Sequence, residues 1–186
     1  MSEKADEEIA SDVQHGDLES FGVLVERYEP KIARYARKFL FEREDVKDLV
    51  QDVFIKAYVN IQSFDPKRRF SPWIYRIAHN EFINALRKKT KSSFTFDLDL
   101  VLPHVVAPET ADEGAHKKDL KQILGRSLDE LSPKYREPLV LFYFEDMDYK
   151  EIADILQIPV STVGVRLARG KAMLEHILKT KNVQDI

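Results

Sequence analysis

Residues 148–174 read DYKEIADILQIPVSTVGVRLARGKAML, and this stretch decides the fold class. Asp148 is followed three residues later by a glutamate, the spacing of a capping box, which predicts a helix over residues 149–156. A short turn with a proline follows, and we expect Ser161 to cap a second helix. Two short amphipathic helices joined by a tight turn are typical of a helix-turn-helix.

The second helix of this pair has the chemistry of a helix that binds in the major groove of DNA. Hydroxyl groups at its start and cations along one side are groups that contact phosphates and base edges. The candidate DNA contacts are Ser161, Thr162, Gly164, Val165, Arg166, Arg169 and Lys171. An ordinary helical hairpin with a solvated basic face is the alternative, and the combination of cap, turn and cations favours DNA binding.

Helical periodicity governs most of the remaining chain. Apolar residues recur at three- and four-residue spacing over residues 43–63. A similar stripe over residues 21–39 passes Pro30, which either begins a second helix or kinks the first. The Ser-Pro pairs at 71–72 and 132–133 each resemble an N-cap followed by a first-turn proline. We therefore predict an all-α protein.

The helical pattern is interrupted once, in the middle of the chain. Residues 92–115 contain prolines and scattered acids, as an interdomain linker does. Alternating apolar residues over 94–100 leave open a short strand or an extended segment in a partner's groove. We predict two small helical domains, 1–91 and 116–186, joined by this irregular linker.

Composition excludes several classes of protein. Charged residues make up 33% and hydrophobic residues 44%, a balance that supports a folded, soluble chain. The absence of cysteine excludes disulfide scaffolds and cysteine nucleophiles. Because the sequence has no apolar run of about 18 or more residues and begins with an acidic stretch, we expect no membrane insertion and a cytoplasmic location. Histidines lack metal-ligand spacing, and phosphate-binding and nucleophile motifs are missing, so we predict no metal, no cofactor and no catalytic site.

A basic and aromatic stretch over residues 64–91 is a second candidate interface. The whole chain has a formal net charge of −3, so any signal for nucleic-acid binding must be local. Cations that follow phosphates and aromatic rings that stack on bases suit single-stranded or melted DNA. The candidates are Phe64, Lys67, Arg68, Arg69, Phe70, Trp73, Tyr75, Arg76, Asn80, Asn84, Arg87 and Lys88. The alternative for Trp73 and Tyr75 is a place in the core.

The outer face of the helix predicted over 43–63 is a third candidate surface. It carries Asp48, Gln51, Asp52 and Lys56 at helical spacing. A solvated face and a metal site are alternatives, but nothing nearby supplies the further ligands that a metal needs. Docking on a basic partner is therefore the functional interpretation.

Three motifs together resemble the extracytoplasmic function (ECF) sigma factors of bacterial RNA polymerase. They are DLVQDVFIKAY at 48–58, FSPWIYRIAHN at 70–80 and the helix-turn-helix at 148–174. The resemblance implies that the first domain melts and reads the minus-ten promoter element and that the second reads the minus-thirty-five element. It also implies three partners, which are core RNA polymerase, promoter DNA and an anti-sigma factor.

The resemblance assigns roles to the candidate residues. The acidic face corresponds to the family's surface for the polymerase clamp helices, with Asp48, Gln51, Asp52 and Lys56 as its members here. The loop at 63–71 corresponds to the specificity loop that receives a flipped base, and Trp73 begins the segment beside the melted strand. Asn84 stands where the family often has aspartate, and Gly164–Val165 where many members have a basic residue and a serine. Promoter preference therefore does not carry over.

Two other functions remain open from the residues alone. A stand-alone helix-turn-helix regulator would bind duplex operator DNA, usually as a symmetric dimer, but it has no use for the basic-aromatic stretch or the acidic face. A small nucleic-acid enzyme would use Asp48 and Asp52 with a divalent metal and lose turnover when both become alanine. We favour a transcription initiation factor that catalyses no covalent step.

Overall fold

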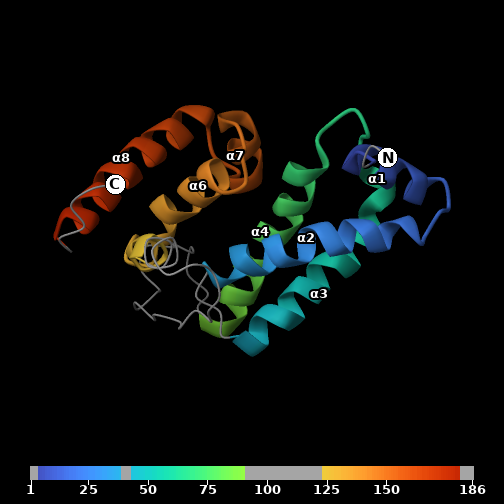
Figure 1. The fold of residues 1–186 in the computed structure, drawn as a ribbon, viewed down its shortest axis with the longest axis horizontal. Coiled ribbons are helices and arrows are strands. Elements are labelled where there is room, and N and C mark those ends of the chain that lie inside the picture. Colours follow the sequence, from blue (N-terminus) through green and yellow to red (C-terminus); the bar gives the residue numbers. More distant parts are fainter. Residues whose placement is uncertain (1–3, 39–42, 91–122, 181–186) are drawn as a thin grey trace. The chain divides into compact units, whose positions relative to one another are not determined.

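The computed structural model describes residues 4–38, 43–90 and 123–180, and in these ranges every regular element is a helix (Figure 1). The helices group into two compact units. The first unit contains α1 (Asp6–Gln14), α2 (Ser20–Arg37), α3 (Arg43–Asn60), the 3-10 turn η1 (Ile61–Ser63) and α4 (Phe70–Thr90). The second contains a helical segment at 123–129, α6 (Pro133–Tyr143), α7 (Tyr149–Leu156) and α8 (Val160–Thr180). The predicted fold class is confirmed, whereas the predicted linker lies outside the described residues.

The first unit is built around an aromatic core. Helices α2, α3 and α4 pack on one another, and α1 packs on α2, α4 and η1 (Figure 1). The Tyr35 ring lies 5.1 Å from Tyr75 and 5.5 Å from Phe82, which joins α2 to α4. Helix α2 runs without a break through the exposed Pro30, so the alternative of a second helix beginning there is wrong.

Helix α1 is attached to α2 through the carboxylate of Asp6. The Tyr28 hydroxyl donates a hydrogen bond to Asp6 Oδ2 at 2.6 Å, and the Arg27 guanidinium forms an ion pair with Asp6 Oδ1. Burial of Tyr28, together with the nearby Asp6, raises the pKa of the Tyr28 hydroxyl. The phenol therefore stays protonated and serves as a hydrogen-bond donor between the two helices.

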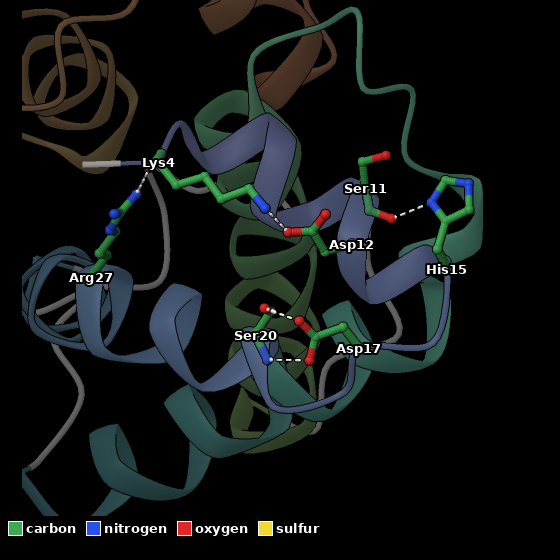
Figure 2. A network of polar contacts seen from close by, with 7 residues as sticks. All are labelled: Lys4, Ser11, Asp12, His15, Asp17, Ser20 and Arg27. Atoms are coloured by element: carbon green, nitrogen blue, oxygen red, sulfur yellow. Dashed lines mark hydrogen bonds and ion pairs between the residues drawn. The ribbon is translucent and has the colours of Figure 1, made fainter. Parts of the chain in front are cut away.

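The two ends of α1 are held by further polar contacts (Figure 2). Lys4, which precedes α1, forms an ion pair with Asp12 near the other end of the helix. In the turn before α2, the Ser20 hydroxyl donates to Asp17 Oδ2 at 2.6 Å, and the hydrogen bonds from Ser20 lower the pKa of Asp17. These bonds fix the direction in which the chain enters α2.

The second unit depends on one buried cation and one close helix contact. The Arg136 side chain is 1% exposed and donates hydrogen bonds of 2.9, 2.7 and 2.7 Å to the carbonyl oxygens of residues 128, 129 and 131. Burial lowers the pKa of Arg136. Helix α8 approaches α6 at Gly170, where a Cβ atom would lie 3.1 Å from the Tyr135 carbonyl oxygen. Ser132 is the N-cap residue of α6 and Pro133 its first helical residue, as predicted, but the Ser132 hydroxyl makes no capping bond.

Two predicted helix starts are wrong by two positions. Helix α4 begins at Phe70, before Ser71, and the Phe70 N–H donates to Glu7 Oε1 of α1 at 2.8 Å. Helix α8 begins at Val160, and the Pro159 carbonyl accepts the first helical hydrogen bonds. Ser161 therefore lies inside the first turn of α8 and is not its cap.

Candidate nucleic-acid interface

The helix-turn-helix begins with the capping box that the sequence predicts. Asp148 Oδ1 accepts hydrogen bonds from the N–H groups of Lys150 at 2.7 Å and Glu151 at 2.9 Å. In return, Glu151 Oε2 accepts the Asp148 N–H at 2.8 Å. The prediction is confirmed, and α7 has the predicted bounds Tyr149–Leu156 because its start is specified within one turn of chain.

A Schellman turn ends α7 and directs the chain into α8. Gln157 has a φ of +54°, in the left-handed region where glycine is usual, and the Ile158 N–H donates to the Ala153 carbonyl at 3.1 Å. Ala153 of α7 and Val163 of α8 are buried. The turn thus brings the apolar sides of both helices into one core and leaves the opposite side of α8 exposed.

The structure separates the candidate DNA contacts of α8 into two groups. Exposed members are Ser161, Val165, Arg169 and Lys171, and half-buried members are Thr162, Gly164 and Arg166. Gly164 faces Tyr149 of α7, because a Cβ atom at 164 would lie 3.5 Å from Tyr149 Cε2. Gly164 is therefore a contact point between the two helices, and the exposed members are the ones that a partner of α8 can contact.

The basic loop at 64–69 is held in place by hydrogen bonds from α1 and by one within the loop. Gln14 of α1 donates hydrogen bonds from Nε2 to the carbonyl oxygens of Ile61 at 2.7 Å and Phe64 at 2.8 Å. Within the loop, Asp65 Oδ1 accepts the Lys67 N–H at 3.0 Å. The side chains that this turn leaves exposed are Lys67, Arg68 and Arg69.

Three of the four candidate aromatic rings lie in the core, which corrects their expected place on the surface. Phe64, Phe70 and Tyr75 are 4%, 0% and 1% exposed. The half-buried Trp73 ring packs 5.4 Å from both Phe64 and Phe70. Because the other three rings are buried, Trp73 is the candidate whose ring remains partly accessible to a base. The Phe64 and Phe70 rings pack against it on the core side.

The polar candidates of α4 lie together with Trp73 on one side of the helix. Their positions follow at intervals of three or four residues, so they share the face opposite the buried Ile74 and Phe82. The exposed members are Arg76, Asn80, Asn84 and Arg87, with Lys88 exposed at the edge of the set. The loop and this face together form a basic surface with one tryptophan, which we call the loop-α4 surface.

The acidic face of α3 is exposed at each of its predicted members. Asp48, Gln51, Asp52 and Lys56 all lie at the surface, and Lys56 in addition forms an ion pair with Glu81 of α4.

Comparison with known proteins assigns both units. Family models match Sigma-70 region 2 over residues 24–92 and Sigma-70 region 4 over residues 121–174. The chain is 35% identical over 175 residues to the ECF RNA polymerase sigma factor SigW of Bacillus subtilis, covering 90% of this chain and 93% of that protein. This chain belongs to the ECF family of RNA polymerase sigma factors. It is also 32% identical to the ECF RNA polymerase sigma-E factor of Escherichia coli K12, covering 95% and 96% of the two chains.

Solved structures with the same fold include a sigma factor. The sigma factor RpoE in complex with the anti-sigma factor NepR from Bartonella quintana is 26% identical, with a TM-score of 0.71 over 86% of this chain and 96% of that chain. CnrH in complex with the cytosolic domain of CnrY is 27% identical, with a TM-score of 0.68 over 95% and 99%. The predicted ECF membership is confirmed. In this sigma factor, the loop-α4 surface lies within the region 2 match, and the helix-turn-helix within the region 4 match.

Sequence reasoning missed several residues of the sigma factor's surfaces. Ile55 and Val59 are 52% and 72% exposed and follow Asp48 and Asp52 at helical spacing, so the α3 face is partly apolar. Their spacing was visible in the sequence and could have placed them on the same face as the two aspartates. Gln14 lies far from the loop in sequence, and no local pattern indicates its role. Among the described residues, no helix is long and apolar enough to cross a membrane.

Proposed function

We propose that this ECF sigma factor binds core RNA polymerase, directs initiation at a specific set of promoters and assists promoter melting, and that it catalyses no covalent step. The single observation that carries the proposal is the presence of two DNA-compatible surfaces of different chemistry in one chain. The loop-α4 surface suits a separated strand, and α8 suits a duplex. A stand-alone regulator needs only the surface that binds duplex DNA.

The α3 face is the proposed polymerase-binding surface. Its exposed carboxylates, Asp48 and Asp52, would steer a basic partner, while Ile55 and Val59 supply the apolar area that a stable contact requires. Lys56 takes a smaller part than the sequence suggests because it is paired with Glu81. Since RNA polymerase works in the cytoplasm, the proposal places the chain there.

The loop-α4 surface is the proposed site for the minus-ten element. Exposed cations of the loop neutralise phosphates, and Trp73 offers a ring for stacking on a base that leaves the duplex. Asn80 and Asn84 present amides that pair with base edges. Base stacking contributes roughly 1–3 kcal/mol per base, which offsets the cost of separating the strands.

Helix α8 is the proposed site for the minus-thirty-five element, with an anti-sigma factor as a further partner of the chain. The exposed Ser161, Arg169 and Lys171 lie where a duplex in contact with α8 places phosphates and base edges. The two solved structures described above are complexes, one with an anti-sigma factor and one with the cytosolic domain of CnrY. This supports control of the chain by an inhibitor that covers its partner-binding surfaces.

Size-exclusion chromatography with bacterial core RNA polymerase, followed by run-off transcription on genomic fragments, tests the proposed function. We expect a stable complex that begins transcripts at discrete sites and thereby identifies the promoter. A chain that shifts duplex DNA by itself but forms no complex with core polymerase would instead be a stand-alone regulator. Metal-dependent turnover abolished by replacing Asp48 and Asp52 with alanine would indicate an enzyme.

A further inference from the structure

The outward stripe of α8 consists of short side chains. Positions 161, 165, 168 and 172 follow at intervals of four, three and four residues and so share one face of the helix. The opposite face packs into the core through Val163, Leu167 and Gly170. The four stripe residues, all exposed, are Ser161, Val165, Ala168 and Ala172.

The charge around this stripe suits duplex DNA as its occupant. Helix α8 carries four cations and one acid in its sequence, and the acid, Glu175, is paired with Lys179 at 2.7 Å. Arg169 and Lys171 are exposed beside the stripe. Because the stripe itself has no long side chain, the helix can lie close to the base edges while the flanking cations contact phosphates.

The stripe offers methyl groups to the bases and few hydrogen-bonding groups. Ser161 is its one polar side chain, and Val165 is 49% exposed at its centre. The neighbouring Gly164 has no side chain, and the Tyr149 ring rests against it. In the major groove, the apolar feature of a base pair is the 5-methyl group of thymine, which alanine and similar apolar side chains contact.

We infer that Val165, with Ala168 one turn further along, determines upstream promoter preference by contacting thymine 5-methyl groups. The inference rests on the proposed function, because it requires α8 to lie in the major groove of the minus-thirty-five element. It gives this chain a means of base discrimination that needs no long polar side chain at 164 or 165. Burial of one methyl group corresponds to about a fourfold change in affinity.

Replacing thymine with deoxyuridine tests the inference, since uracil lacks only the methyl group. The probe is a fluorescent duplex of a promoter mapped by run-off transcription, with deoxyuridine placed in the upstream element or, as a control, downstream of the start site. For the complex of core polymerase with the wild-type chain, we expect affinity to fall about fourfold per contacted thymine in the upstream element only. Val165→Ser should remove most of this sensitivity, whereas Met173→Ser, an exposed apolar position of α8 away from the stripe, should keep it.

The possible outcomes separate the inference from the function on which it rests. If no discrete start sites are found, the proposed function fails before the base comparison is made. If transcription starts at discrete sites but thymine and deoxyuridine duplexes bind equally, the promoter is recognised without methyl contacts and the inference is wrong. If Val165→Ser and the wild type are equally sensitive to deoxyuridine, the assignment to Val165 is wrong.

Discussion

Gly170 lies so close to Tyr135 that a Cβ atom on the glycine would come within 3.1 Å of the tyrosine carbonyl oxygen. The Leu139 side chain would be 3.0 Å away on the same side. A backbone oxygen within α6 cannot move aside without displacing the helix. The contact therefore requires glycine at this position of α8, in spite of its poor helix propensity.

The two glycines of α8 should respond in opposite directions to alanine. Gly170→Ala should lower the free energy of unfolding of the second unit by about 1–2 kcal/mol, because overpacking outweighs the gain in helix propensity. Gly164→Ala should raise it by about 0.5–1 kcal/mol, since its Cβ would make only an ordinary contact with Tyr149. Amide hydrogen exchange in α8 measures both changes in stability. A Gly170→Ala variant that is more stable than the wild type would show that α6 and α8 can move apart to accommodate the methyl group.

Removal of the buried guanidinium should destabilise the second unit. Arg136→Met leaves the carbonyl groups of residues 128, 129 and 131 without these charged donors, so we expect a loss of at least about 2 kcal/mol in the free energy of unfolding. The matched control is Arg126→Met at an exposed position of the same unit, which should change it by less than about 0.5 kcal/mol. Urea denaturation compares the two, and similar values for both variants would contradict a special role of Arg136.

Loss of the Gln14 amide should loosen the basic loop. Gln14→Leu removes both hydrogen bonds to the carbonyl groups of Ile61 and Phe64, so amide exchange at residues 67–69 should accelerate and promoter opening should slow. Glu8→Leu, an exposed change on the same helix, is the control. Unchanged exchange in the loop of Gln14→Leu would mean that packing of Phe64 holds the loop without the amide.

High pH should weaken the first unit through Tyr28. Its pKa is raised in the folded state, so its contribution to stability is complete below the ordinary tyrosine value of about 10 and is lost as the pH rises above it. Tyr28→Phe should cost about 1 kcal/mol at pH 7 by removing the bond to Asp6. Urea denaturation at several pH values should show that the stability difference between wild type and Tyr28→Phe shrinks above about pH 10. A stability difference that stays constant with pH would show that ionisation of Tyr28 does not affect folding.

Polymerase binding and promoter opening should be separable by substitution. Replacing both Asp48 and Asp52 with lysine should weaken binding to core polymerase about tenfold or more. The control, Glu26→Lys with Glu29→Lys, makes the same charge change at exposed positions of α2 and should leave this binding unchanged. Trp73→Ala should slow promoter opening about tenfold while core binding stays within about twofold. Circular dichroism checks the fold of each variant, and equal effects of both changes on every step would indicate misfolding.

The sequence by itself determined the features that depend on neighbouring residues. The capping box of Asp148 and Glu151 closes within one turn, so the start of α7 could be predicted and is found as predicted. Helical periodicity likewise predicted the long α3 and the all-α class. Motif order was specific enough to indicate the ECF family, because three motifs had to occur at suitable separations.

Only the tertiary structure decided which candidate residues are available to a partner. Phe64, Phe70 and Tyr75 belong to the core, although aromatic side chains are suited to stacking on the bases of DNA. The Gln14 amide and the Phe64 carbonyl that it binds are 50 residues apart in the chain. Burial and hydrogen bonding across such separations depend on how whole helices pack, and the periodicity of one helix shows which face is apolar but not what that face meets.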